Sequence, residues 1–389
     1  MVIHRKIEHE FSELLKDYPV VCLIGPRQVG KTFFIKTFRE KLKRQSLYLD
    51  LELPTGLARL SDPQFYLEQH SDQIIIIDEV QHRPDLFPLL RAMIDKDRRA
   101  GRFILLGSAS RVIIQDTSES LAGHIAFMEL KPFSLTELPN ISSWQQLWLQ
   151  GGFPLSFLAR NQESSMTWRV NFVRSYIERD LPLLGLQVSP VQLERMWRML
   201  SHLHGQMLNI SMVAESLGIS SHTAKGYIDF MENAFLIRRL YPFSANLRKR
   251  LVKTPKIFIS DSGILNYFHQ INSLDELLSH PSAGHSWEGF VIQQIGANIS
   301  KEIELFYFRT HNRAEIDLVL MKGMKPVSAI EIKLSNSPKL TRGNTLAFED
   351  IKARSNYIIT PSSDDYLMNQ NTRVCSLVDF LGKYIPSHP

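Results

Sequence analysis

The sequence predicts an α/β protein with several domains, the first of which contains a mostly parallel sheet. Three observations predict this class. Strand-length apolar segments alternate with amphipathic, helix-like segments from residue 1 to about 140, and a similar mixed pattern returns after about residue 266. A chain of 389 residues is too long for one ordinary domain. The composition, 44% hydrophobic and 22% charged, suits a globular protein that buries several cores.

Charge, cysteine content and hydropathy argue against several classes of protein. The chain has 45 lysines and arginines and 40 acidic residues, so its formal charge is +5. This mild excess does not identify a binding partner by itself. The two cysteines, Cys22 and Cys375, lie far apart, which argues against a disulfide scaffold and a zinc site. The N-terminus has no signal-peptide core, and no apolar run is long enough to cross a bilayer. We therefore expect a cytoplasmic protein without a membrane partner.

The first block, residues 1–140, is expected to form a core of five strands with helices between most of them. The strand candidates are residues 20–24, 46–51, 74–78, 103–106 and 126–130.

Three further blocks follow this core. Residues 141–205 have a helical pattern that is interrupted by prolines, which suits a small helical domain. Residues 206–265 contain a helix-turn-helix pattern and then a basic segment. Residues 266–389 return to mixed α/β structure, with a helix near 287–299 and alternating strands after it. The sequence thus predicts four domains.

The strand at 20–24 runs directly into a glycine-rich loop and a helix-like segment. The loop reads Gly25-Pro26-Arg27-Gln28-Val29-Gly30-Lys31-Thr32. This is the P-loop pattern in its strand-loop-helix setting. Gly25 and Gly30 allow a tight turn whose amide groups point at phosphate oxygens. Lys31 is expected to reach the β- and γ-phosphates, and Thr32 to bind Mg²⁺. Residues 25–32 therefore predict an ATP site with Mg²⁺ as its cofactor.

Two adjacent carboxylates follow a buried strand further along the chain. The run of four isoleucines at 74–77 is typical of a strand that is covered on both faces, and it ends in Asp78 and Glu79. Ligands of open α/β sheets bind at this carboxyl edge. Asp78 is expected to hold the Mg²⁺ shell, and Glu79 to polarise the attacking water. Ser108, after the strand at 103–106, is a candidate sensor of the γ-phosphate, or part of an ordinary serine-rich turn.

Several motifs follow one another in a fixed order. They are Gly-Pro-Arg-Gln-Val-Gly-Lys-Thr (25–32), Ile-Asp-Glu-Val-Gln (77–81), Leu-Leu-Gly-Ser-Ala-Ser (105–110), Leu-Ala-Gly (121–123), Leu-Lys-Pro-Phe-Ser-Leu-Thr-Glu-Leu (130–138), Gly-Gly-Phe-Pro (151–154) and Tyr-Ile-Glu-Arg-Asp-Leu (176–181). With these motifs the chain resembles the prokaryotic AAA-type ATPases that carry a DUF4143 C-terminal region, over nearly its whole length. The resemblance implies an additional-strand P-loop core, a helical lid, a winged helix and a last domain that is nuclease-like.

The sequence departs from this family at one basic position. Members often have arginine after Leu-Ala-Gly, where this chain has His124, which carries little charge at neutral pH. Arg111 and Arg179 are alternative candidates for an arginine finger, and a surface ion pair is the ordinary role of either residue. The sequence does not choose between them.

Residues 209–228 have the rhythm of two short helices joined by a turn. Ser211 is expected to cap the first helix, Gly218 to end it, and Ser220 or Ser221 to cap the second. Lys225 on the second helix is a candidate DNA contact.

A basic segment without acidic residues follows, and phosphate binding is its functional interpretation. Its cations are Arg238, Arg239, Arg248, Lys249, Arg250, Lys253 and Lys256, of which we expect Arg248, Lys249 and Arg250 to contact DNA. The alternative is a winged helix that only packs against protein, beside a solvated basic loop.

Two alternating strands near the C-terminus carry a third constellation. Asp317 lies in the strand at 314–320, and Glu331 and Lys333 share one face of the strand at 327–334. The pattern resembles the PD-(D/E)xK nuclease core, with Glu288 on the preceding helix as its additional acid. In that role Glu288, Asp317 and Glu331 would hold Mg²⁺ or Mn²⁺, and Lys333 would orient water. The alternative is a Glu–Lys pair on an exposed sheet face.

The sequence as a whole predicts an ATPase whose nucleotide state controls a DNA-facing winged helix and a nuclease-like domain with restriction-endonuclease-like α/β architecture. One alternative is an ATP-dependent DNA- or protein-binding switch whose last domain is catalytically silent. Another is a remodeller of proteins without a nucleic-acid role. ATP and DNA are the predicted partners, and a homo-oligomer remains open.

Overall fold

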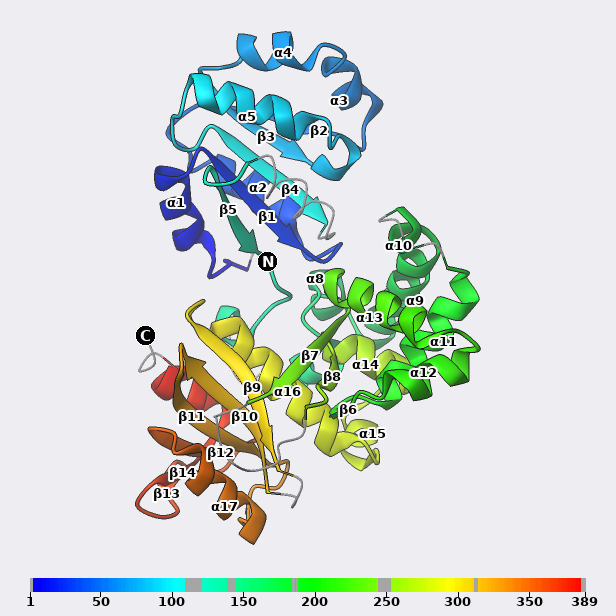
Figure 1. Ribbon diagram of the computed structural model, residues 1–389, viewed down its shortest axis with the longest axis vertical. Coiled ribbons are helices and arrows are strands. Elements are labelled where there is room, and N and C mark those ends of the chain that lie inside the picture. Colours follow the sequence, from blue (N-terminus) through cyan, green and yellow to red (C-terminus); the bar gives the residue numbers. More distant parts are fainter. Residues whose placement is uncertain are drawn as a thin grey trace. The chain divides into compact units, whose positions relative to one another are not determined.

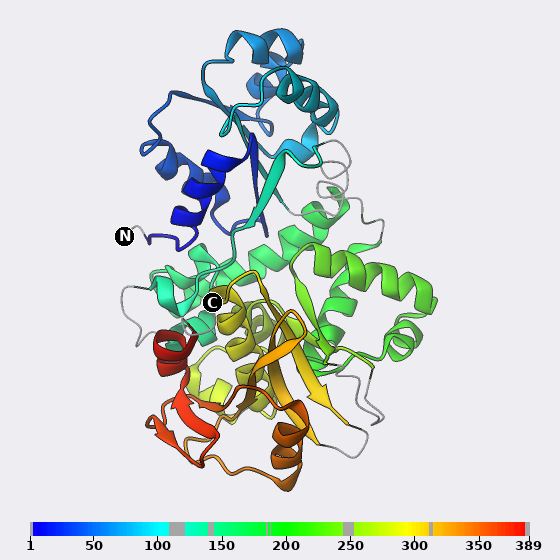
Figure 2. The same cartoon turned by 60° about the vertical axis from the view of Figure 1, so that its left-hand side comes forward.

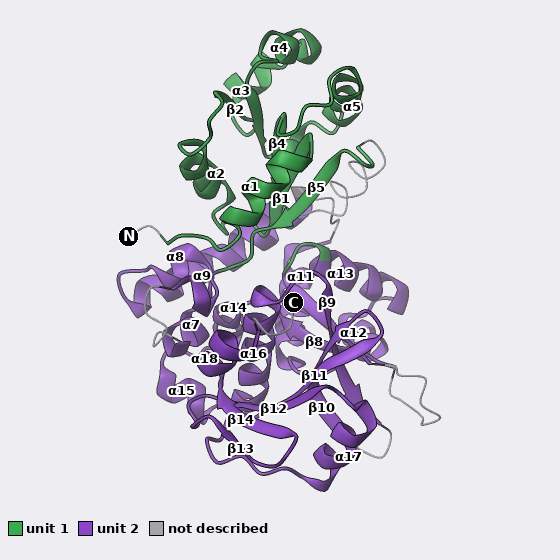
Figure 3. Cartoon of the chain, turned by 90° about the vertical axis from the view of Figure 1, so that its left-hand side faces the viewer, with its two compact units in different colours: residues 1–132, 233–235 green, residues 133–232, 236–389 purple. Residues whose placement is uncertain are grey.

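The computed structural model describes residues 3–108, 121–138, 144–183, 186, 188–243, 253–310 and 314–385. The chain divides into two units (Figures 1 and 3). Unit 1 comprises Met1–Pro132 with Asn233–Phe235, and unit 2 comprises Phe133–Glu232 and Leu236–Pro389. Within the described ranges, no helix combines the length and apolar character that crossing a membrane requires.

Unit 1 contains a five-stranded parallel sheet in the order β2-β3-β4-β1-β5 (Figure 1). Its strands are β1 (Val20–Gly25), β2 (Ser46–Asp50), β3 (Ile74–Asp78), β4 (Phe103–Ser108) and β5 (Ile125–Glu129). All five predicted strands are therefore confirmed, each to within two residues at either end. The strand β4 lies between β1 and β3, which is the additional-strand arrangement that the resemblance implies.

Helices cover this sheet because β1, β3 and β4 are apolar on both faces and every residue in them is buried. The helices are α1 (Glu8–Asp17), α2 (Lys31–Arg39), α3 (Pro54–Arg59), α4 (Pro63–Gln69) and α5 (Leu86–Lys96), with a short 3₁₀ turn η1 (Val80–His82). The apolar face of α5 shares one core with β1, β3 and β4. On α1 and α2, Phe11 packs edge-on against Phe34 and Phe38 at 5.4 and 5.1 Å.

The register of the parallel strands brings the ends of four strands to one edge of the sheet. Gly25 at the end of β1 lies opposite Ser108 at the end of β4. Asp78 at the end of β3 lies opposite Asp50 of β2. This edge of unit 1 therefore gathers the loop and the polar side chains that the sequence singles out.

Unit 2 begins with a helical region and ends in mixed α/β structure. Its helices are α7 (Trp144–Gln150), α8 (Pro154–Phe157), α9 (Gln162–Ser175), α10 (Leu181–Leu183), α11 (Pro190–His202), α12 (Ile210–Leu217), α13 (Ser221–Asn233), α14 (Ser262–Phe268), α15 (Leu274–Ser279), α16 (Ala283–Asn298), α17 (Arg342–Ile351) and α18 (Leu377–Asp379), with the short turns η2 (Leu135–Glu137), η4 (Tyr176–Asp180) and η5 (Phe380–Tyr384).

Unit 2 contains one nine-stranded sheet, in the order β13-β14-β12-β11-β10-β9-β7-β8-β6. The strands are β6 (Gln206–Met207), β7 (Ile237–Pro242), β8 (Lys256–Ile259), β9 (Ile303–Arg309), β10 (Glu315–Lys322), β11 (Lys325–Ile332), β12 (Ser355–Thr360), β13 (Tyr366–Leu367) and β14 (Thr372–Ser376). Figure 2 shows β9 to β11 in yellow to orange as its long strands. The division of unit 2 into a lid, a winged helix and a nuclease-like domain stays a prediction.

The helix-turn-helix pattern at 209–228 forms α12 and α13, with one change in the predicted caps. Asn209, and not Ser211, caps α12, because its side chain accepts a hydrogen bond from the Met212 amide. Gly218 ends α12 in the left-handed conformation, with φ of 66°, as predicted. The Ser220 hydroxyl accepts from the Thr223 amide at the start of α13. Ala224, Ile228 and Met231 form the buried face of α13.

Candidate functional site

The glycine-rich loop lies between β1 and α2, and its backbone requires glycine at both ends. At Gly25, φ is 151°, and a Cβ atom would lie 2.4 Å from the Leu130 carbonyl oxygen. At Gly30, φ is 98° as the chain enters α2. Gln28 inside the loop also has a positive φ, of 61°. The loop therefore holds the turned backbone that the pattern predicts, at the N-terminus of a helix.

Lys31 is buried at the start of α2, and its ammonium group points into the loop. The Nζ atom donates to the carbonyl oxygens of Gly25 and Pro26 at 2.9 and 3.0 Å. Burial lowers the pKa of Lys31 to about 8, although the charges of Glu79 and Asp78 partly offset this effect. Arg27 in the same loop pairs with Glu52 at 2.6 Å. The Lys31 ammonium group thus binds the backbone carbonyls of its own loop.

Asp78 gathers two hydroxyl groups at the end of β3. Its Oδ2 atom accepts from the Thr32 hydroxyl at 2.7 Å and from the Tyr48 hydroxyl at 2.5 Å. Burial raises the pKa of Asp78, although these two hydrogen bonds oppose the effect. Sequence reasoning missed Tyr48, because its place beside Asp78 depends on the pairing of β2 with β3. The one signal in the sequence is the alternation of side-chain faces along β2, which places Tyr48 and Asp50 on the same face of that strand.

Glu79 follows Asp78 in a left-handed conformation, with φ of 54°. This backbone is rare for a residue other than glycine. The Glu79 Oε2 atom accepts from the Ser108 hydroxyl at 3.3 Å and from the Gln81 side-chain amide. The structure therefore brings Glu79 and Ser108 together, as the sequence predicts, and adds Gln81, which sequence reasoning missed.

The three residues considered for the arginine-finger position lie in different environments. His124 is buried, and its Nε2 atom lies 3.7 Å from Asp95 Oδ1. Arg179 is exposed in η4 of unit 2. Arg111 lies outside the described residues. The choice between the two arginines therefore stays open.

In unit 2, Glu288, Asp317, Glu331 and Lys333 come together from α16, β10, β11 and the residue after β11. Lys333 Nζ pairs with Glu331 Oε1 at 2.5 Å, and Asp317 Oδ2 accepts from the Ile332 amide at 2.9 Å. Glu331 is buried, so the alternative of an exposed Glu–Lys pair is wrong for the glutamate. A residue that sequence reasoning assigned elsewhere, Lys256, also lies among these acids.

The basic segment divides into two parts. Arg239 pairs with Asp229 at 2.7 Å and with Glu232, and Lys256 is buried among carboxylates, so the phosphate role expected for these two is wrong. Lys225 is exposed on α13 and lies 3.2 Å from Asp229. Arg248, Lys249 and Arg250 lie outside the described residues.

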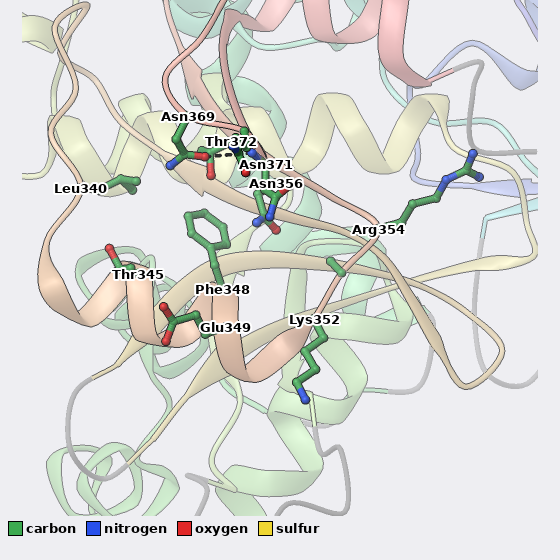
Figure 4. A pocket seen from close by; sticks show the side chains of 12 residues that line it. Leu340, Thr345, Phe348, Glu349, Lys352, Arg354, Asn356, Asn369, Asn371 and Thr372 are labelled. Atoms are coloured by element: carbon green, nitrogen blue, oxygen red, sulfur yellow. Dashed lines mark hydrogen bonds between the residues drawn. The ribbon is translucent and has the colours of Figure 1, made fainter.

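A separate cavity of about 580 Å³ lies on unit 2 between α17 and the strands β12 and β14 (Figure 4). Its labelled side chains include Phe348 from α17, Asn356 from β12 and Asn369 and Asn371 from the segment before β14. Of the residues to which the sequence assigns chemistry, none lines this cavity. The cavity is therefore separate from the two constellations described above.

Three family models match consecutive parts of the chain. An AAA domain matches residues 17–139, a domain of unknown function (DUF8612) matches residues 141–275, and a second one (DUF4143) matches residues 283–380. The first of these matches agrees with the parallel sheet and glycine-rich loop of unit 1. The chain is thus a nucleotide-binding ATPase of the AAA class.

Two mycobacterial proteins are similar to most of this chain. An uncharacterized protein of Mycobacterium tuberculosis is 38% identical over 346 residues, which are 88% of this chain and 76% of the relative; a Mycobacterium bovis protein matches equally well. The Walker-type ATPase of Pyrococcus abyssi, a solved structure, is 16% identical with a TM-score of 0.47, covering 69% of this chain and 96% of that one. The chain belongs to the family of AAA-type ATPases with a C-terminal DUF4143 region, together with its mycobacterial relatives.

Proposed function

We propose that this chain hydrolyses ATP at the edge of the unit 1 sheet and uses the nucleotide state to control unit 2. The observation that carries the proposal is the convergence of Lys31, Thr32, Asp78 and Glu79 on one glycine-rich loop. In this proposal residues 25–32 wrap the phosphates, and Lys31 leaves the loop carbonyls for the β- and γ-phosphate oxygens.

The residues beside Lys31 suit a magnesium ion. Thr32 Oγ1 and Asp78 Oδ2 lie 2.7 Å apart, and a hydroxyl with a carboxylate is a hard oxygen donor set of the kind that Mg²⁺ prefers. Thr32 would bind the ion and Asp78 would hold its shell. The bound ion would neutralise charge on the phosphate oxygens. Tyr48 would keep the Asp78 carboxylate oriented by its hydrogen bond.

Glu79 has the role of general base in this proposal. Its carboxylate accepts hydrogen bonds from Ser108 and Gln81, and its backbone leaves the extended conformation of β3 for the left-handed region. The carboxylate would accept a proton from water as that water attacks the γ-phosphorus. The Ser108 hydroxyl donates to the same carboxylate oxygen as Gln81. In this proposal Ser108 contacts both the γ-phosphate and Glu79, and so acts as the γ-phosphate sensor.

Glu79→Gln is expected to bind ATP with unchanged affinity and to hydrolyse it at least about 100-fold more slowly, because an amide cannot take the proton. Steady-state turnover and fluorescent-nucleotide binding test the two parts of this result. Glu68→Gln, which removes an exposed partner of Lys96 in the same unit, is the matched control and should keep the wild-type rate. Wild-type turnover by Glu79→Gln would show that Glu79 is not the base.

The DNA-facing role rests on a second observation, the order of elements around α13. The helices α11, α12 and α13 are followed by β7 and β8, while β6 pairs with the other side of β8. In this proposal α12 and α13 act as a helix-turn-helix, and β6, β7 and β8, at one end of the nine-stranded sheet, act as its wing. Ser221, His222 and Lys225 lie on the exposed face of α13, the helix that would enter a major groove.

Reversing Arg248, Lys249 and Arg250 to glutamate is expected to weaken binding to duplex DNA. It should also lower the slope of log affinity against log salt by about 0.9 for each phosphate that the segment no longer neutralises. Fluorescence anisotropy at several salt concentrations gives both values. The control reverses three exposed lysines of unit 1, Lys16, Lys43 and Lys96, which makes the same change in net charge. Equal affinity and slope in the two variants would rule out this segment as the DNA contact.

For the C-terminal part of unit 2, the catalytically silent alternative is favoured over the nuclease. The observation that favours it is the ammonium group of Lys256, which lies among the carboxylates that a nuclease would use for its metal. We therefore propose that this part of the chain binds a partner without cleaving it.

A further inference from the structure

The acidic cluster of unit 2 consists of Glu288, Glu315, Asp317 and Glu331. The first three lie around one lysine, Lys256, and Glu331 pairs with Lys333. Lys256 is the first residue of β8 and is only 4% exposed. Its Nζ atom lies 2.9 Å from Glu288 Oε1, 2.9 Å from Glu315 Oε1 and 3.7 Å from Asp317 Oδ1. An ammonium group with three carboxylate neighbours is the central cation of this cluster.

Lys256 and the carboxylates around it stabilise one another's charged forms. Burial by itself lowers the pKa of Lys256, but the charges of Glu288, Asp317 and Glu315 outweigh it and raise the pKa above its ordinary value. The lysine therefore stays charged at any physiological pH. The pKa of Glu288 is lowered despite burial, mainly because of Lys256. A buried charge needs such partners, so removing Lys256 would leave several carboxylates uncompensated.

One carboxylate of the acidic cluster, that of Glu331, has an oxygen atom that accepts no hydrogen bond from the lysine. Glu331 is buried, and within the described residues its Oε2 atom has no hydrogen-bond partner. Burial and the charges of Glu331 and Glu288 raise the pKa of Asp317 well above its usual value. Lys333 pairs with the other Glu331 oxygen, Oε1, so the buried Oε2 atom is an acceptor that neither lysine satisfies.

The residues present do not fit the metal ion that a nuclease-like fold implies. Mg²⁺ needs oxygen ligands at about 2.0–2.1 Å in near-octahedral geometry, which demands that carboxylates converge on an open position. Here the Lys256 ammonium lies within hydrogen-bonding distance of Glu288 and Glu315, and close to Asp317. Across the ranges that the structure describes, no group of three or more His, Cys, Asp and Glu side chains is arranged to hold a metal.

We propose that Lys256 is the resident cation of the acidic cluster and replaces the divalent metal ion of a catalytic site. The wild-type cluster is then a metal-independent structural centre that joins β8 to α16 and β10. Removing the lysine side chain frees Glu288, Asp317 and Glu331 to rearrange and converge on a divalent cation in its place. This inference concerns unit 2 alone and does not depend on ATP hydrolysis.

The test uses the full chain carrying Lys31→Ala, which silences the nucleotide site, and titrates Mn²⁺ by calorimetry. We expect negligible heat with Lys256 in place and about one Mn²⁺ per chain after Lys256→Ala. Adding Asp317→Asn to Lys256→Ala should abolish the new binding. Lys322→Ala, which removes an exposed lysine of β10 paired with Glu302, is the control and should gain no site.

Two outcomes of the titration would overturn the proposal. The first is that the chain with Lys256 intact binds Mn²⁺ and that Asp317→Asn abolishes this binding. This comparison does not require a stable Lys256 variant. The other is a folded Lys256→Ala chain that binds no Mn²⁺. If Lys256→Ala is too unstable to titrate, its melting temperature with and without Mn²⁺ decides instead. The proposal expects Mn²⁺ to raise that temperature, and to leave the temperature of Lys256→Ala with Asp317→Asn unchanged. No rise with Mn²⁺ would contradict the proposal.

Discussion

Lys31→Ala is expected to lower the affinity for ATP by a factor of more than about 100, which corresponds to about 3 kcal/mol or more. The lysine is the buried cation of the loop, and its Nζ atom is already within 2.9 Å of the Gly25 carbonyl that lines it. Arg27, the other cation in the loop, is committed to Glu52 at 2.6 Å. Replacement of Lys31 therefore removes the charge that would face the β- and γ-phosphates.

Equilibrium binding of a fluorescent ATP analogue measures this loss, and turnover should fall below detection at the same time. Lys16→Ala is the matched control, because Lys16 is an exposed lysine of the same unit that pairs with Glu13 on α1. It should keep wild-type affinity. A melting temperature shared by the two variants would show that the effect is local. Retained ATP affinity in Lys31→Ala would mean that the glycine-rich loop does not bind the phosphates as proposed.

The parts of the site that could be predicted from the sequence are those whose signal lies in one continuous segment. The loop at 25–32, the isoleucine run before Asp78 and the five strands of unit 1 are all of this kind. Parallel strands bring their carboxyl ends to one edge, so the meeting of Gly25, Asp78 and Ser108 follows once the strands are assigned.

The residues that could not be predicted depend on which strands are neighbours. Tyr48 contacts Asp78 only because β2 pairs with β3, and the sequence does not state the strand order. Lys256 is the clearer case. In the sequence it belongs to a basic segment, and only the fold places it beside Glu288, 32 residues away, and beside β10. A charge pattern along the chain therefore gave the wrong role for this lysine.

Gly151→Ala is expected to destabilise unit 2 by about 2–5 kcal/mol, from a left-handed backbone and an overpacked contact together. At Gly151, φ is 77°, and a Cβ atom would lie 2.1 Å from Asp261 Oδ1. That carboxylate is buried and cannot easily move. Asp261 accepts from the amide of Gly152 at 2.8 Å and from the amide of Ile264 at 3.1 Å, where it caps α14.

Tryptophan fluorescence during denaturant unfolding isolates this effect, because all five tryptophans of the chain lie in unit 2. Gly218→Ala is the matched control. Gly218 also has a left-handed backbone, with φ of 66°, but an added Cβ would meet nothing within 4 Å. It should cost only about 1–2 kcal/mol for the backbone. The difference between the two variants thus measures the contact between the Gly-Gly-Phe-Pro turn and Asp261. Equal destabilisation in both would mean that this turn does not hold α14, and that the hydrogen bonds of Asn266 to the Trp148 and Leu149 carbonyls join α14 to α7 without it.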